Sequence, residues 1–324
     1  MNTAVSKESS APAAVQWKRI FRRSGVFWAL VGLFVIAGMA SPTFLQSNNL
    51  INVVRQISIT GIVSIGMTFV ILTGGIDLSV GSTVGVVAVV CASLLKMGTP
   101  ELMIVITGLA IGLALGSLNG LGVTVGKIVP FIMTLGTYVA LRGVAMIIAN
   151  GQPISWTKTG VKFDFLGGQS LLGIPVSVWV FALVFMVAFL VLKYTPYGRY
   201  VYAVGDCPEA ARLSGIGVKF ITYSVYAING LLAGLCALVY ISRLSVGEPT
   251  AGTGLELDAI AMVIIGGTAT TGGEGGVAGT LIGAAIIAIL ANLLNLLGIS
   301  PFIQQVVKGL IIILAVLLEG RRRK

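Results

Sequence analysis

Long apolar stretches recur along the whole chain, and they limit what it can fold into. A helix that crosses the hydrocarbon core of a bilayer needs about 20 mostly apolar residues. Ten such segments can be placed, and the chain is 56% hydrophobic and only 10% charged. A water-soluble domain carries about 25% charged residues, so this chain could not cover a water-facing surface. The sequence therefore predicts an all-α, polytopic bundle of transmembrane helices.

The predicted spans differ in length. They run roughly over residues 25–41, 50–72, 82–97, 101–124, 129–149, 174–193, 219–241, 257–270, 277–298 and 302–318. The third and the eighth are short for a full crossing, so we expect them to be broken or re-entrant helices. The apolar pattern thus supports eight to ten spans, with about ten preferred.

The lysines and arginines predict how the chain is oriented, because basic residues are enriched in cytoplasmic loops. With ten spans, fourteen of them fall on the inner side and four on the outer side. Residues 1–24 and 319–324 then form cytoplasmic tails, the second of them basic. The membrane domain spans residues 25–318 and carries a cytoplasmic loop at 194–218. We expect a multi-pass protein of a bacterial inner membrane.

Several kinds of chemistry are excluded by the residue types. The chain has no histidine, which removes histidine bases and histidine metal ligands. Its three cysteines, Cys91, Cys207 and Cys236, are scattered and indicate no disulfide framework or thiolate metal site. The basic residues form no continuous stripe, so no nucleic-acid partner is expected. We predict no cofactor, no metal and no catalytic residues.

Glycines four residues apart predict close helix packing. Residues at i and i+4 share one face of a helix, and glycine there lets a second backbone approach. The residues assigned to packing are Gly108, Gly112, Gly116 and Gly120 in one ladder, with Gly230 and Gly234, and Gly279 and Gly283, in shorter ones. The pattern predicts a compact bundle with little room for a wide permanent pore.

Two glycine-rich segments, residues 73–82 and 266–276, interrupt the apolar runs. Non-helical backbone at membrane depth survives only inside protein or beside water. Broken segments in corresponding places of two halves indicate an internal repeat in transporters. We therefore expect two broken or re-entrant segments and an internal repeat.

Asp77, in the first of these segments, is the acid best placed to lie within the membrane. A carboxylate at the centre of a span costs about 2.5–3.5 kcal/mol on insertion scales. Two hypotheses remain open: a gate or path residue, or a cap in which Asp77 or Ser79 accepts N–H groups at the start of the next helix. Asn119 and Glu274 are further path or gate candidates.

The loop at 194–218 contains a sequence typical of a short capped helix. Asp206 suits the N-cap and Glu209 stands three residues later, as in a capping box. Arg212 falls near the helix end and Gly215 at the position after it. The helix either docks onto a cytoplasmic partner or simply connects two spans. The residues assigned to docking are Asp206, Glu209, Ala210, Ala211, Arg212, Leu213 and Gly215.

Several strings together make a more specific signal. They are residues 66–68 (GMT), 71–82 (ILTGGIDLSVGS), 197–199 (YGR), 203–205 (AVG), 209–216 (EAARLSGI), 249–261 (PTAGTGLELDAIA) and 295–300 (NLLGIS). In these strings the chain resembles the membrane permeases of carbohydrate ABC importers of the ribose, xylose, arabinose and galactose type. The likeness covers about residues 42–318. It departs at the second break, where Glu274 stands in a region that is usually basic in the family.

The resemblance implies partners and a mechanism. Such permeases pair as two identical or related chains, dock cytoplasmic ATP-binding subunits and receive sugar from a periplasmic binding protein. The helix at 206–216 would then couple ATP-driven closure to alternating access. Three alternatives remain: a related ABC permease for branched-chain amino acids or nucleosides, an ion-coupled secondary transporter, and a membrane enzyme.

Overall fold

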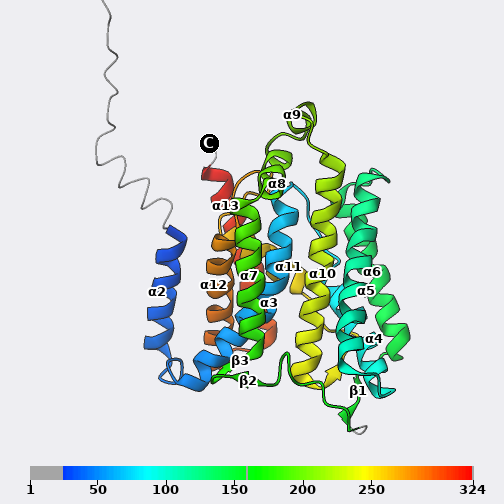
Figure 1. Ribbon diagram of the computed structural model, residues 1–324. Helices are drawn as coiled ribbons and strands as arrows, with labels where there is room; N and C mark the ends of the chain where they lie inside the picture. The colour runs from blue at the N-terminus through cyan, green and yellow to red at the C-terminus, as the bar shows by residue number, and fades with distance from the viewer. Residues whose placement is uncertain (1–24, 158–159, 323–324) are drawn as a thin grey trace, which may run out of the picture.

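The structure is a computed structural model that describes residues 25–157 and 160–322, and it is a bundle of helices (Figure 1). Its helices are α2 (Gly25–Ala40), α3 (Ser47–Leu72), α4 (Val80–Lys96), α5 (Glu101–Thr124), α6 (Pro130–Ala149), α7 (Val176–Tyr194), α8 (Pro196–Asp206), α9 (Pro208–Leu213), α10 (Val218–Leu244), α11 (Leu255–Ile265), α12 (Val277–Leu296) and α13 (Pro301–Arg322). The predicted tail at 1–24 lies outside the described residues. The other predicted tail begins within α13.

Each of the ten predicted spans coincides with one helix, and α8 and α9 occupy the predicted loop. Within the described residues, six helices are long and apolar enough to cross a membrane: α3, α5, α6, α7, α10 and α12. The structure is therefore that of a helical membrane protein, while the number of ten spans stays a prediction. The third and eighth segments are α4 and α11, of 17 and 11 residues.

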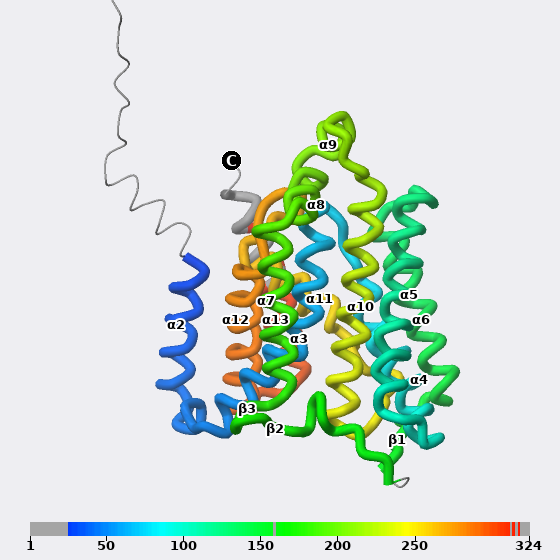
Figure 2. The backbone as a smooth tube through the Cα atoms, in the orientation of Figure 1, coloured from blue at the N-terminus to red at the C-terminus, as the bar shows by residue number. Residues whose placement is uncertain are grey.

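Apart from α8 and α9, successive helices run in alternate directions along the bundle, with the short helices α4 and α11 included (Figures 1 and 2). One end carries α8 and α9, and the start of α2 and the end of α13 lie at that end as well. The opposite end carries two small antiparallel pairs. There β1 (Ile154–Ser155) pairs with β4 (Val246–Gly247), and β2 (Ser170–Leu171) pairs with β3 (Ile174–Pro175).

Helices α3 and α10 form the centre of the bundle, because most of their side chains are buried. Helices α5, α6 and α7 lie around them and expose large apolar side chains, among them Leu118, Ile147 and Leu183. In water such an apolar exterior would be unfavourable, whereas lipid is as apolar as these side chains. The outer face of the bundle therefore suits a bilayer.

The first glycine ladder is on α5 and lies against α10. Helices α5 and α10 make the most extensive helix–helix contact of the described structure. A Cβ on Gly112 would lie 2.9 Å from the Cα of Gly234, and one on Gly116 would lie 2.8 Å from the Cα of Gly230. Two ladders from distant parts of the sequence thus face each other. No side chain larger than hydrogen fits between the two backbones.

The shorter ladder of α12 faces α11 in the same way. A Cβ on Gly279 would meet the carbonyl oxygen of Gly266, and one on Gly283 would lie 3.0 Å from the Gly266 nitrogen. Contacts of this kind hold the short helix α11 in place, although it is too short to anchor itself in a membrane.

The contact between α5 and α10 predicts that Gly112→Ala destabilises the protein. Overpacking of a filled interior costs about 1–3 kcal/mol, whereas alanine in a free helix position gains up to about 1 kcal/mol over glycine. Gly136→Ala on α6 is the matched control, because a Cβ there meets nothing within 4 Å. Thermal unfolding in detergent should show a lower midpoint for Gly112→Ala only. Equal midpoints for the two variants would contradict this packing.

Candidate functional site

The first break is a sharp turn between α3 and α4. Helix α3 ends at Leu72, and Gly74 follows with φ of +77°, a conformation that glycine adopts without strain. The chain then passes through Asp77 and Ser79 before α4 begins at Val80. Both side chains are buried, so this irregular backbone lies inside the protein.

The Asp77 carboxylate accepts three hydrogen bonds. Its Oδ1 accepts the backbone N–H of Ser79 at 2.9 Å and the Ser79 hydroxyl at 2.7 Å. Its Oδ2 accepts the amide of Asn229, on α10, at 2.9 Å. Gly66 makes room for this contact, because a Cβ there would lie 3.0 Å from the Cα of Asn229. A buried carboxylate is thereby provided with donors.

Further hydrogen bonds extend this cluster to α5 and α6. Asn119 on α5 donates to the Ser79 hydroxyl at 2.7 Å, and Thr137 on α6 donates to the Asn119 side-chain oxygen at 2.7 Å. All the members are at least nine-tenths buried. The polar cluster, by which we mean Asp77, Ser79, Asn119, Thr137 and Asn229, therefore ties the break to three helices.

Three of the four predicted path or gate residues, Asp77, Ser79 and Asn119, lie together in the polar cluster. The fourth, Glu274, is exposed on the second break, and no hydrogen bond joins it to the cluster within the described residues. Sequence reasoning missed Asn229 and Thr137. Their only signal was a polar residue within an apolar span, which many spans contain.

The cap hypothesis for Asp77 agrees with the structure in one respect. The carboxylate does accept an N–H group, that of Ser79, which directly precedes α4. The Ser79 hydroxyl, however, donates to Asp77. The two residues thus stabilise the turn before the helix, and this geometry leaves a gate role open.

The second break, between α11 and α12, contacts the first. The N–H of Gly273 donates to the carbonyl of Leu72, at the end of α3, at 3.0 Å. Gly205 of α8 packs between them, because a Cβ there would meet both the Leu72 oxygen and the Gly273 nitrogen. The two breaks and the end of α8 therefore meet at one place, at the end of the bundle that carries α9.

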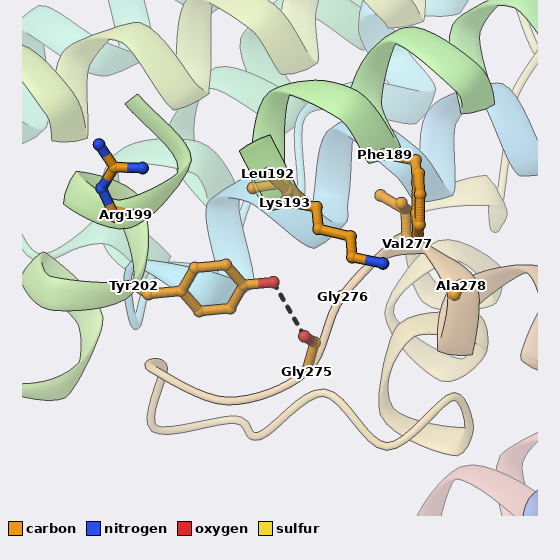
Figure 3. A pocket seen from close by; sticks show the side chains of 9 residues that line it. All are labelled: Phe189, Leu192, Lys193, Arg199, Tyr202, Gly275, Gly276, Val277 and Ala278. Carbon is orange, nitrogen blue, oxygen red and sulfur yellow. Dashed lines mark hydrogen bonds between the residues drawn. The ribbon is translucent and has the colours of Figure 1, made fainter. Parts of the chain in front are cut away.

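A cavity of about 420 Å³ lies beside this junction (Figure 3). It is bounded by the end of α7, by α8 and by the start of α12, and the Tyr202 hydroxyl donates to the carbonyl of Gly275 at 3.0 Å. Lys193 extends toward Val277 in this view. This hydrogen bond from Tyr202 is a second contact of α8 with the second break, beside that of Gly205 with Gly273.

The short helix predicted in the loop is present, but the residue predicted as its N-cap, Asp206, is wrong. Asp206 is the last residue of α8, and Cys207 stands at the N-cap of α9. Two helices form because Pro208 lacks the N–H group that would continue α8. Gly215 adopts φ of +84° after the helix, as expected for that position.

Helix α9 is the outermost element at its end of the bundle (Figure 1). Ala211 is buried against the rest of the chain, whereas Ala210 and Leu213 are exposed. Glu209 pairs with Arg212 through two hydrogen bonds, of 2.6 and 3.1 Å. The hydrogen bonds from Arg212 lower the pKa of Glu209, so the pair persists above the ordinary glutamate pKa and weakens as the pH falls through the lowered one.

The hydrogen bonds of Asp77 predict very different effects for two substitutions. Asp77→Leu leaves the donors of Ser79 and Asn229 unpaired, at about 1–3 kcal/mol for each buried group. Asp77→Asn is much milder if Asn229 rotates its amide, because the Oδ1 of Asn229 is without a hydrogen-bond partner in the described part of the chain. Thermal unfolding in detergent separates the two. Equal losses would contradict a hydrogen-bonding role for Asp77.

Comparison with known proteins reveals a family and several relatives. Residues 49–316 match the family model described as the branched-chain amino acid transport system / permease component. The chain is 45% identical over 297 residues to the Ribose import permease protein RbsC of Escherichia coli K12. The aligned residues make up 91% of this chain and 92% of that relative. It is 42% identical to RbsC of Bacillus subtilis 168, covering 95% and 96% of the two chains.

The Xylose transport system permease protein XylH of Escherichia coli K12 is more distant, at 35% identity over 87% of each chain. No solved structure matches. The match covers most of the chain, including both breaks, the polar cluster, α8 and α9. The chain belongs to the family of ABC-transporter permeases described by the branched-chain amino acid transport system / permease component model.

Proposed function

We propose that this chain is the membrane permease of an ATP-driven sugar importer and that ribose is its substrate. The observation that carries the proposal is 45% identity, over nine-tenths of both chains, to a ribose import permease. The permease provides the path through the membrane, and a separate subunit hydrolyses ATP. The relatives reported above carry the names of sugars, which favours a sugar over a branched-chain amino acid or a nucleoside.

The proposed partners are two copies of the chain or a paralogous pair, a cytoplasmic ATP-binding subunit and a periplasmic sugar-binding protein. Leu213, exposed at the end of α9, suits the contact with the ATP-binding subunit. Because α8 touches the end of α3 and the second break, a movement of α9 would reach the end of α3 and the polar cluster. This is the proposed route by which ATP binding changes access to the path.

Reconstitution tests the proposal. The chain is placed in proteoliposomes with the ATP-binding subunit and the ribose-loaded binding protein, and ATP-dependent ribose uptake is measured against xylose, allose and leucine as competitors. We expect uptake that requires all three components and that ribose inhibits best. Uptake without the ATP-binding subunit would instead support an ion-coupled transporter, and inhibition by leucine would support an amino-acid permease.

The exposed tip of α9 predicts that Leu213→Asp weakens assembly with the ATP-binding subunit. A charge in an apolar contact is costly to desolvate, so co-purification and sugar-stimulated ATPase activity should both fall by at least about tenfold, or 1.4 kcal/mol. The control is the exposed Phe220→Asp on α10, outside α9. Equal assembly of Leu213→Asp and the unmodified chain would remove α9 from the contact.

The native cysteines predict a simple test of orientation. Cys207 is exposed between α8 and α9, whereas Cys91 and Cys236 are buried. A membrane-impermeant maleimide should label Cys207 in inside-out vesicles and leave it unlabelled in intact cells or spheroplasts. Cys207→Ser controls for the buried thiols. Labelling from the outside would reverse the proposed orientation, in which both chain ends lie in the cytoplasm.

A further inference from the structure

Residues 248–254 form a series of turns that packs against α4, partway along the bundle. The segment follows β4, climbs along α4 and ends where α11 begins. The oxygen of Ala251 would lie 3.3 Å from a Cβ on Gly85, and Val84 Cβ would lie 3.0 Å from one on Gly252. Contact with residues well within α4 places this non-helical segment at membrane depth.

Arg142 supports the same placement. It lies in the middle of α6, a candidate membrane span. Its guanidinium donates to the carbonyls of Pro249 at 2.5 Å and Ala251 at 3.0 Å. A helix would satisfy such carbonyls by itself, so an arginine is needed where the chain is not helical. We regard Arg142 as a positioning residue for the segment.

One side of the segment is polar and uncovered. Thr250 and Thr253 are exposed, and their chain neighbours Pro249 and Ala251 are buried. The Thr253 hydroxyl donates to the carbonyl of Thr250 at 2.6 Å, so an irregular, hydroxyl-bearing backbone is presented outward. Irregular backbone at membrane depth does not face lipid, because lipid cannot satisfy its polar groups. It faces either another protein surface or water.

The segment also has a counterpart in the polar cluster. Residues 75–80 read Gly-Ile-Asp-Leu-Ser-Val, and residues 254–259 read Gly-Leu-Glu-Leu-Asp-Ala. The first string lies between α3 and the start of α4, and the second follows α10 and β4 and forms the start of α11. The first string holds Asp77, and the second holds Glu256, whose Oε2 is buried without a hydrogen-bond partner in the described residues.

This correspondence favours another alignment of the predicted internal repeat. The order of the elements aligns the break at 73–79 with the segment at 248–254, and not with residues 266–276. Since α3 and α10 run in opposite directions (Figure 1), a repeat aligned in this way would be inverted. Inverted halves place their broken helices on either side of a substrate path near the bilayer midplane.

From these observations we propose that the uncovered face of residues 250–253 lines the water-filled path of the substrate, with the Thr250 and Thr253 hydroxyls as contacts for a neutral, hydroxylated solute. The inference rests on the proposed function. Threonine hydroxyls both donate and accept hydrogen bonds, as sugar hydroxyls do. They carry no charge that would have to be desolvated when a neutral solute passes.

Cysteine substitution tests this inference. Thr250→Cys and Thr253→Cys are made in a Cys207→Ser background and assembled with the ATP-binding subunit in proteoliposomes. A hydrophilic maleimide is then added with and without ATP and vanadate. The matched control is Met186→Cys, at an exposed position in the middle of the lipid-facing helix α7. Sugar uptake by the unlabelled variants checks the proposed function separately.

Thiols react as thiolates, which require water, so at least one threonine position should react about tenfold or more faster than Met186→Cys. The rate should change when vanadate traps the complex, and labelling should block uptake. Reactivity as low as that of Met186→Cys in both states would overturn the inference. So would dry contact between two copies, seen as a disulfide between partner cysteines with no maleimide labelling in either state.

Discussion

The structure depends on one constraint: every backbone N–H and C=O at membrane depth needs a partner within the protein. Long helices meet it by themselves. Where the chain is not helical, side chains meet it instead. The carboxylate of Asp77 accepts a hydrogen bond from the N–H of Ser79, and the Thr268 hydroxyl accepts one from the N–H of Gly276. The guanidinium of Arg142 donates to the carbonyls of Pro249 and Ala251. Asp77, Ser79 and Thr268 are buried polar residues at places where helices are interrupted.

Close packing of backbones makes these interruptions tolerable. Glycines bring α5 against α10 and α12 against α11 without intervening side chains. Helices in a membrane gain little from the hydrophobic effect and depend on such contact. The short helices α4 and α11 are therefore enclosed by long ones, and the breaks beside them are kept from lipid.

The arrangement also supports the proposed coupling between the peripheral helices α8 and α9 and the polar cluster. Gly205 of α8 lies against Leu72 and Gly273, where the two breaks touch. Gly205 and Gly273 have no side chains that could absorb a small displacement, so movement of α8 would shift the end of α3 directly. Asp77 follows Leu72 by only five residues and is bonded to α10 through Asn229. A rigid junction of this kind fits a permease whose energy comes from another subunit.

The sequence by itself determined the class of the protein. Apolar runs and glycine spacing are local properties, and they decide directly whether a helix suits a bilayer and how closely helix backbones can approach. All ten predicted spans coincide with helices for this reason. Local patterns failed at one helix boundary and for contacts that join distant residues. The capping pattern predicted Asp206 as the N-cap of the loop helix, whereas Asp206 ends α8 and Cys207 is the N-cap of α9. The internal repeat was predicted from the glycine-rich residues 266–276, whereas the order of the helices favours residues 248–254 as the counterpart of the first break. Only the tertiary structure decided that Asn229 reaches Asp77 and Arg142 reaches Pro249, since each pair joins a helix to a non-helical segment more than 100 residues away.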